Sequence, residues 1–236
     1  MKFIKFETPI NKNKACKLFN SNIDSFKVYT GQEQILSMTH DLILNNIAKH
    51  ISLEKEEIAY FISILKHKQV LKKSFLLKEG QICKYISFVN SGTLRAYYLD
   101  KEGRESTIMF AITDWWITDI YCFINRLPAM LNIETVENST IFQLQKDHLD
   151  TLLLTVPKFE RFFRILMQNA YIREQLRVIQ NLSLSAEQRY DNFLSKYPQV
   201  AKKVTQKQIA SYLGITPEFL STIRGNKSKR LFLKLP

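Results

Sequence analysis

The segment Thr205–Gly225, with the sequence TQKQIASYLGITPEFLSTIRG, combines residue types and spacings that suit the reading of DNA. Its first residue and Gln208 fit a capping box, in which a hydroxyl and a side-chain amide pair with free backbone groups at a helix start. Gly214 can adopt the positive φ that a tight helix end requires. Thr216 and Pro217 suit the cap and the first position of a second helix. Together these signals predict a helix-turn-helix.

The second helix of this motif is expected to bury Leu220 and Ile223 and to turn its remaining side chains toward a DNA groove. The residues predicted to contact DNA are Thr205, Gln206, Thr216, Pro217, Glu218, Ser221, Thr222, Arg224, Lys227 and Lys229. An ordinary helical hairpin packed in a protein core is the alternative interpretation of the same pattern.

Basic charge is concentrated where this motif lies. The chain has a formal net charge of +12, and residues 201–236 contain eight Lys or Arg against a single acid, Glu218. Neutralisation of phosphates with release of counterions explains both the charge and its position. The composition therefore indicates double-stranded DNA as a partner, whereas a solvated basic tail is the simpler alternative.

Residues for catalysis or for metal binding do not form a recognisable pattern. The motifs GxSxG, GxxxxGK and HExxH are missing, so no enzyme class is indicated. Cys16, Cys83 and Cys122 are widely separated, which favours reduced thiols and cannot supply an iron–sulfur cluster. We expect no cofactor. We also expect no membrane span and a cytoplasmic protein, since the first residues lack a signal-peptide core.

Helices and strands that would position the motif are indicated by hydrophobic periods. Apolar residues at helical spacing predict two helices between Leu42 and Leu65, and Lys146–Leu154 indicates a third. Between them a period of two, interrupted by turn residues, predicts an antiparallel barrel or roll. The expected strands are Val70–Leu77, Tyr85–Val89, Thr93–Leu99, Glu105–Ala111, Leu131–Val136 and Thr140–Leu144.

A long helix follows, with two apolar stripes. One stripe alternates spacings of three and four and predicts a heptad seam of a parallel homodimer, formed by Phe162, Ile165, Asn169, Ile172, Leu176 and Ile179. The second stripe, Phe159, Phe163, Leu166 and Ala170, is expected to pack on the strand domain. A single amphipathic core helix is the alternative to the seam. Ser185–Tyr197 predicts a further helix, with a capping box formed by Ser185 and Gln188.

The chain is thus predicted to be an α+β protein with four parts. These are an N-terminal extension of unclear structure (residues 1–37, with Met38 as an alternative start), a sensor roll (38–156), a long dimerisation helix (157–183) and a DNA-binding domain (184–236).

This order of parts resembles the Crp/Fnr family, the cyclic-AMP receptor protein and its relatives, from about Leu42 to the C-terminus. The resemblance rests on Gly80 in LLKEGQ, Gly92 in YISFVNSGTLRAYYL, Gly103 in LDKEGRES and the motif QIASYLGITPEFLSTIR. It implies N-terminal helices with a cyclic-nucleotide-binding-like jelly roll (a double-stranded β-helix), a parallel dimer and a C-terminal winged helix-turn-helix. It also implies transcription regulation by ligand-dependent reorientation of the DNA-binding heads, with RNA polymerase as a partner.

The nucleotide-binding residues of the family are not matched. Relatives that bind cyclic AMP use a Gly-Glu pair for the ribose, which aligns with Thr118 and Asp119, and an Arg with a small hydroxyl residue for the phosphate, which falls near Ala129. Arg126 is close but displaced, and a buried phosphate needs paired donors and cations. The resemblance therefore implies a possible ligand pocket at Thr118, Asp119, Arg126 and Ala129 that does not take cyclic AMP, with an unknown effector. A cyclic-nucleotide sensor with an atypical phosphate site and a dimeric adaptor that does not bind DNA are the alternatives.

In the reading helix, Glu218 matches the recognition glutamate of the family, which implies a hydrogen bond from cytosine N4. Pro217 and Thr222 stand where the best-known members have arginines, so a different operator is expected. Arg224 is expected to contact guanine or phosphate.

Overall fold

The computed structural model describes residues 33–232, and the surroundings of the side chains are described for residues 40–227. Cys16 and nearly all of the predicted extension, residues 1–37, lie outside the described residues. Contacts divide the chain into two compact units. One comprises Met1–Ile64 with Asp147–Ile165, and the other comprises Leu65–Lys146 with Leu166–Pro236. The predicted boundaries at residues 37, 156 and 183 stay predictions.

The first unit is helical. It contains α2 (Glu33–Ala48), α3 (Lys55–Ser63), nearly all of α5 (Lys146–Thr155) and the first turns of α6 (Lys158–Ser183). Its core includes Phe61 of α3 stacked on Phe159 of α6, with ring centroids 4.9 Å apart. Lys158 reinforces this packing by donating to Glu57 over 2.8 Å, and this hydrogen bond holds the pKa of the Glu57 carboxyl below its usual value.

Three phenylalanines of α6 belong to this helical core. Phe162 is buried and meets Phe163 edge-on at 5.2 Å, so it does not lie on an exposed dimer seam, where the heptad pattern had put it. Phe159 and Phe163 were expected to pack on the strand domain, but they lie within the helical unit instead. Periodicity identified both apolar stripes, but it carries no information about which partner each stripe meets.

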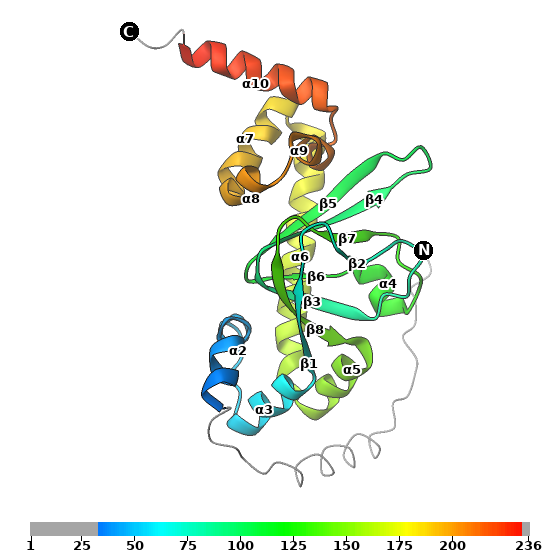
Figure 1. Ribbon diagram of the computed structural model, residues 1–236, viewed down its shortest axis with the longest axis vertical. Helices are drawn as coiled ribbons and strands as arrows, with labels where there is room; N and C mark the ends of the chain where they lie inside the picture. Colours follow the sequence, from blue (N-terminus) through cyan, green and yellow to red (C-terminus); the bar gives the residue numbers. More distant parts are fainter. Residues whose placement is uncertain (1–32, 233–236) are drawn as a thin grey trace. The chain divides into compact units, whose positions relative to one another are not determined.

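The second unit contains two four-stranded antiparallel sheets (Figure 1). One sheet has the order β1 (Leu65–Val70), β8 (Ser139–Gln145), β3 (Tyr85–Ser91) and β6 (Trp115–Ile117). The other has the order β2 (Phe75–Leu77), β7 (Asn132–Thr135), β4 (Thr93–Leu99) and β5 (Glu105–Ile112). This arrangement confirms the predicted jelly roll and the α+β class.

Several elements of the roll differ from the sequence-based expectation. The predicted strand Val70–Leu77 is interrupted, because β1 already ends at Val70 and β2 begins at Phe75. The residues of β1, LKHKQV, have four exposed side chains in a row, so they show no period of two and were not recognised as a strand. Strand β6 and the short helix α4 (Ile120–Asn125) were missed as well, since each is only one turn or a few residues long.

Gly92 connects β3 to β4 in a way that only glycine permits. Its φ is +100°, and a Cβ atom at this position would collide with the side chain of Ser139 on β8. The sharp connection allows β3 to stay in one sheet while β4 enters the other.

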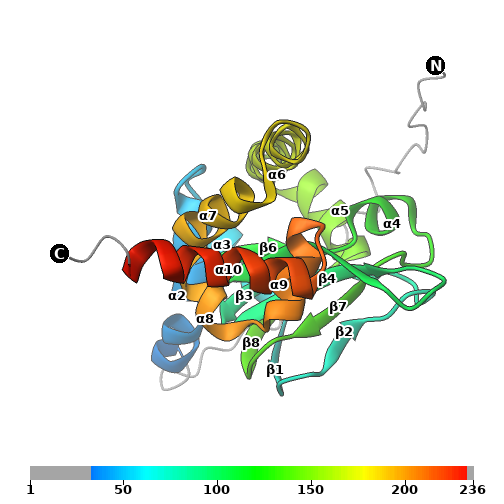
Figure 2. The same cartoon turned by 90° about the horizontal axis from the view of Figure 1, so that it is seen from above.

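Four helices form a C-terminal head. They are α7 (Ala186–Lys196), α8 (Pro198–Lys203), α9 (Gln206–Leu213) and α10 (Pro217–Phe232), seen from above in Figure 2. The predicted capping box of Ser185 and Gln188 starts α7. Within the described residues of the head no strand is present, so the hairpin implied by the word "winged" is not found there. Instead α10 continues through Gly225 to Phe232.

Candidate nucleic-acid interface

The predicted helix-turn-helix is present, with the expected local contacts. Thr205 Oγ1 accepts from the backbone N–H of Gln208 at 3.2 Å, and the Gln208 side chain accepts from the Thr205 N–H at 2.9 Å. Gly214 ends α9 with φ +68°. Thr216 Oγ1 caps α10 by accepting from the backbone N–H of Phe219 at 3.2 Å. The capping box begins α9, Gly214 ends it, and Thr216 begins α10, so the ends of both helices are stabilised by local interactions.

The two faces of α10 separate as predicted. Leu220 and Ile223 are buried in the core of the head. The predicted groove residues Pro217, Glu218, Ser221 and Thr222 are exposed and line a shallow hollow, and Arg224 is exposed one turn further on. This face is therefore accessible to a DNA groove.

Phe219 is an addition to this face that sequence reasoning missed. Its side chain is 51% exposed, although a large aromatic residue is normally buried. It lies three residues before Thr222 on the same side of the helix, where it can contact the methyl group of thymine. The signal was available, because the burial of Leu220 and Ile223 leaves position 219 outside the core.

The other residues predicted to contact DNA are not equivalent. Thr205 and Gln206 are exposed at the start of α9. Lys227 forms an ion pair with Asp191 of α7, and its ammonium lies 5.7 Å from the centre of the Tyr190 ring. Lys227 thus has a contact inside the head. The side chain of Lys229 lies outside the described residues.

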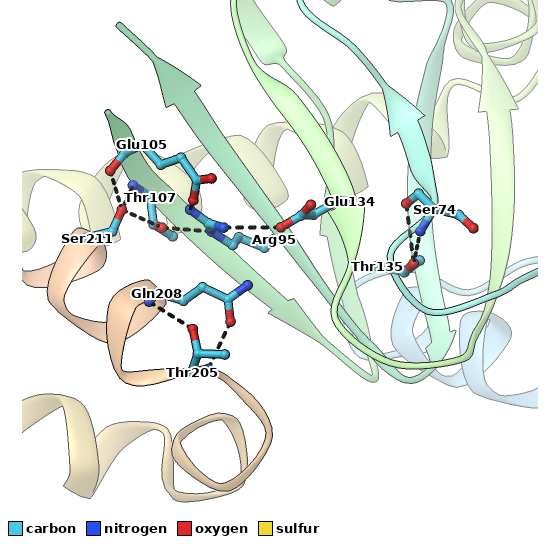
Figure 3. Close-up of polar contacts among 9 residues, drawn as sticks. All are labelled: Ser74, Arg95, Glu105, Thr107, Glu134, Thr135, Thr205, Gln208 and Ser211. Atoms are coloured by element: carbon cyan, nitrogen blue, oxygen red, sulfur yellow. Dashed lines mark hydrogen bonds and ion pairs between the residues drawn. The ribbon is translucent and has the colours of Figure 1, made fainter. Parts of the chain in front are cut away.

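The head is docked on the roll through Ser211 of α9 (Figure 3). Its hydroxyl accepts from the backbone N–H of Thr107 at 2.8 Å and donates to the backbone carbonyl of Glu105 at 2.6 Å. A further hydrogen bond of 3.0 Å joins it to the hydroxyl of Thr107. One serine therefore pairs with two backbone groups of β5, and α9 lies along this strand.

A buried charged cluster continues this contact into the roll. Arg95 of β4 is only 2% exposed, and its guanidinium donates to Thr107 at 2.9 Å, to Glu105 at 2.5 Å and to Glu134 at 3.1 Å (Figure 3). Burial raises the pKa of Glu134, and the positive charge of Arg95 opposes that effect. The buried guanidinium of Arg95 is therefore paired with a carboxylate on either side, and a buried charge needs such partners.

Arg177 of α6 joins the roll and the head. Its guanidinium donates to the backbone carbonyls of Thr107 (2.8 Å) and Ile108 in β5 and to that of Tyr212 (3.3 Å) in α9. It also lies 4.6 Å from the centre of the Tyr212 ring. One planar cation thus spans three elements, which its fork of donors makes possible.

Aromatic side chains complete the docking surface. The Tyr212 ring lies 5.6 Å from that of Phe110 in β5 and 5.3 Å from that of Phe193 in α7. Burial raises the pKa of Tyr212 to about 12. Phe110 and Val136 of the roll belong to the same buried cluster as the core of the head, so the two share apolar packing.

An ion pair closes one edge of this surface. Lys203 of α8 contacts Glu137 of the roll at 2.7 Å, and Thr93 donates to the same carboxylate oxygen at 2.7 Å. Burial by itself raises the pKa of Glu137, but the hydrogen bonds from Lys203 and Thr93 outweigh it and lower the pKa below its usual value.

The residues of the predicted nucleotide pocket are close together, but their polar groups are bonded within the roll. The Asp119 carboxylate caps α4 and accepts from the backbone N–H groups of Met130 (2.8 Å) and Leu131 (3.0 Å). Thr118 donates to the backbone carbonyl of Tyr85 at 3.0 Å. Arg126 ends α4 in the left-handed conformation, with φ +56°, and Ala129 is buried.

The predicted dimer seam is exposed in its C-terminal half. Ile172, Leu176 and Ile179 are each about half exposed, and Tyr171, Val178 and Leu182 extend the apolar surface beside them. Asn169 is exposed and Ile165 is intermediate. Of the predicted seam, Phe162 is buried in the helical core, whereas the residues from Ile165 onward are partly or largely exposed.

The docking residues were not predicted, because their signals are weak in the sequence. Arg95 interrupts an otherwise apolar and aromatic strand, TLRAYYL, and this interruption could have marked a paired buried charge. Ser211 and Arg177 look like ordinary surface residues of helices, so only the fold identifies them.

The described residues contain no group of three or more His, Cys, Asp or Glu side chains placed to hold a metal ion. Among the same residues, no helix has the length and apolar character needed to cross a membrane.

Comparisons with known proteins relate the chain to regulators. Residues 67–155 match the sequence family described as the cyclic nucleotide-binding domain. The regulatory protein HlyX of Actinobacillus pleuropneumoniae is 23% identical over 219 residues, which cover 85% of this chain and 88% of the relative. Electron transport regulator A of Shewanella oneidensis is 24% identical over 80% of each chain. These findings confirm the resemblance inferred from the glycines and the helix-turn-helix.

Solved structures agree on the fold. A transcriptional regulator assigned to the Crp/Fnr family from Eubacterium rectale superposes with a TM-score of 0.63 at 19% identity, over 75% of this chain and 85% of that chain. FixK2 from Bradyrhizobium japonicum also gives a TM-score of 0.63, at 16% identity, over 71% of this chain and 86% of that one. These likenesses show a shared fold over 75% and 71% of this chain.

Proposed function

We propose that this chain, which belongs with the Crp/Fnr transcription regulators, binds double-stranded DNA as a homodimer and reads its sequence with α10. The single observation that carries this proposal is the exposed face of α10, on which Glu218, Phe219 and Thr222 stand on a helix-turn-helix held by its own caps. The basic composition of residues 201–236 supports it, since phosphate contacts need Lys and Arg.

Dimerisation is proposed through α6. The exposed apolar residues Ile172, Leu176 and Ile179 would be covered by the same helix of a second copy, with Asn169 favouring a parallel pair in register. Two heads related by a two-fold axis would then meet two half-sites about one turn of DNA apart, roughly 34 Å.

The effector is proposed not to be cyclic AMP. The carboxylate of Asp119, which occupies the position of the ribose-binding glutamate, is already used by three backbone N–H groups. We further propose that the protein is a regulator without enzymatic activity and without a bound cofactor. The relatives named above, which are regulators, support this. Such a protein would act in the cytoplasm, beside DNA and RNA polymerase.

Selection of bound sequences from random DNA tests the function. We expect an inverted repeat with half-sites about one helical turn apart. Glu218→Ala should relax preference at one base pair of each half-site, because in this proposal its carboxylate accepts a hydrogen bond from cytosine N4. Glu187→Ala, an acid at the start of α7, is the matched control and should leave the selected sequence unchanged. The proposal would be contradicted if the unaltered protein enriched no sequence from the random DNA.

A further inference from the structure

The β-roll contains a cavity of about 410 Å³ that none of the predicted site residues line. Its walls come from both sheets and from the loop before β3. Leu77, Ile82 and Ile133 supply apolar surface, Ser87 and Gln143 supply polar groups, and Lys84 lies at the exposed rim. A cavity of this volume, lined by apolar side chains with a few polar groups, is typical of sites for small organic molecules.

Gln143 has an unused hydrogen-bond acceptor at this cavity. The residue is 3% exposed, and its Nε2 donates to Ser87 Oγ at 3.2 Å. Its Oε1 is buried and has no hydrogen-bond partner among the described residues. A buried amide oxygen without a hydrogen-bond donor is destabilising, so this oxygen is suited to accept a hydrogen bond from a molecule outside the fold.

Ser87 offers the complementary group. Because its oxygen accepts from Gln143, its own proton is available for donation, and no acceptor for that proton is found among the described residues. The two side chains lie opposite each other on β3 and β8, in register. The site therefore presents one acceptor beside one donor.

The lining excludes strongly charged ligands. Lys84 is its single cation, and that side chain is exposed at the rim. Cys83, which also lines the cavity, is buried, and burial raises the pKa of its thiol. A phosphate or a carboxylate would lack paired cations inside the cavity.

We propose that this cavity binds a small neutral carboxamide with an apolar body. Its N–H donates to Gln143 Oε1, its carbonyl oxygen accepts from the Ser87 hydroxyl, and its body lies against Leu77 and Ile133. Thr118, Asp119, Arg126 and Ala129 do not line this cavity, but Cys83 of its wall contacts Thr118 and Asp119. Binding here does not depend on the proposed DNA function, so each can fail without the other.

A series of probes with one apolar body tests the hydrogen-bond pattern. 4-Phenylbutanamide, its N,N-dimethyl derivative and 4-phenylbutanoate are titrated into the full-length isotope-labelled protein and followed by NMR. We expect saturable shifts of the Ser87 and Gln143 resonances with the primary amide. The dimethyl amide, which has no N–H donor, and the charged carboxylate should each bind about tenfold more weakly.

Substitutions then assign the acceptor. Gln143→Leu, which keeps side-chain volume, should reduce the preference for the primary amide over its dimethyl derivative to about threefold or less. Gln69→Leu, on the exposed β1, is the matched control and should keep the full preference. The proposal is overturned if the unaltered protein gives no saturable shifts at Ser87 and Gln143. Equal binding of the two amides overturns it as well, and this comparison does not depend on how well a variant folds.

Discussion

At the scale of single residues, Ser211 joins the head to the roll through one hydroxyl group. Its hydroxyl satisfies the N–H of Thr107 and the carbonyl of Glu105, two backbone groups of β5 on the side where no further strand pairs. Edge strands need such cover, because unpaired backbone groups are costly when they are removed from water. A serine fits here because it both accepts and donates.

Ser211→Ala should loosen the docking at this point. The N–H of Thr107 would lose its partner, so we expect its hydrogen exchange to accelerate about tenfold, equivalent to about 1.4 kcal/mol. Exchange measured by NMR on the intact chain checks this. Ser106→Ala, an exposed serine on the same strand, is the control and should leave the rate unchanged. An unchanged rate in Ser211→Ala would show that the head is not held there.

The ion pair of Glu137 and Lys203 makes docking dependent on pH. The pKa of Glu137 is lowered in the docked state, so its contribution is complete above the usual pKa of glutamate and is lost as the pH falls through the lowered value. Their side chains are 31% and 40% exposed, so solvent screening limits the contribution to about 0–1 kcal/mol.

Thermal unfolding of the protein and of Glu137→Gln checks this dependence. We expect the unaltered protein to be more stable by about 1–3 °C at neutral pH and the difference to disappear as the pH falls through the lowered pKa of Glu137. A difference that stays constant with pH would contradict the assignment. Glu102→Gln, an exposed acid in the loop between β4 and β5, serves as the control.

At the scale of elements, α6 combines three roles. Its first turns place Phe159 and Phe162 in the helical core. Beyond them, one side of the helix carries Arg177, which contacts β5 and α9. The exposed apolar residues Ile172, Leu176 and Leu182 come from the same stretch of α6. A contiguous exposed apolar face of this kind indicates an interface.

Leu176→Asp should convert the proposed dimer to monomers. A charge at the centre of the apolar face would be buried without a partner, at a cost of several kcal/mol. Sedimentation velocity checks the mass, with Asn181→Asp on the opposite face of α6 as the control. A dimer that persists in Leu176→Asp would mean that this face is not the interface.

At the scale of the whole molecule, the contacts between the head and the roll do not cover the exposed face of α10. Contacts with the roll use Ser211 and Tyr212 of α9, whereas the exposed groove residues lie on α10. Lys207, at the start of α9, is exposed, but Lys227 is paired with Asp191. The two lysines should therefore affect DNA binding differently, although both belong to the basic C-terminal part.

Lys207→Ala should weaken binding to all DNA sequences alike. Loss of one phosphate contact should reduce the slope of log K against log salt by about one. Lys227→Ala is the matched comparison, and it should lower the thermal stability of the head with a smaller change of slope. Titrations at several salt concentrations, with fluorescent DNA, measure both. Equal slopes for Lys207→Ala and the unaltered protein would contradict the phosphate contact.

The helix-turn-helix could be predicted from the sequence because its determinants are local. The pairs Thr205 with Gln208 and Thr216 with Phe219 are each three residues apart, and Gly214 acts through its own φ. The strands of the roll were predicted for the same reason, from a period of two. A strand such as β1, whose side chains are exposed on both faces, gave no such period.

Only the tertiary structure decided where these elements meet. Ser211 reaches Thr107 across 104 residues of sequence, and Gln143 reaches Ser87 across 56. Periodicity tells which side of a helix or strand is apolar, but burial depends on the element that covers it. For this reason the sequence determined the local form of the reading head, while the fold decided that Phe162 is core, that Arg95 is buried with its two glutamates, and that the roll holds a cavity with an unused acceptor.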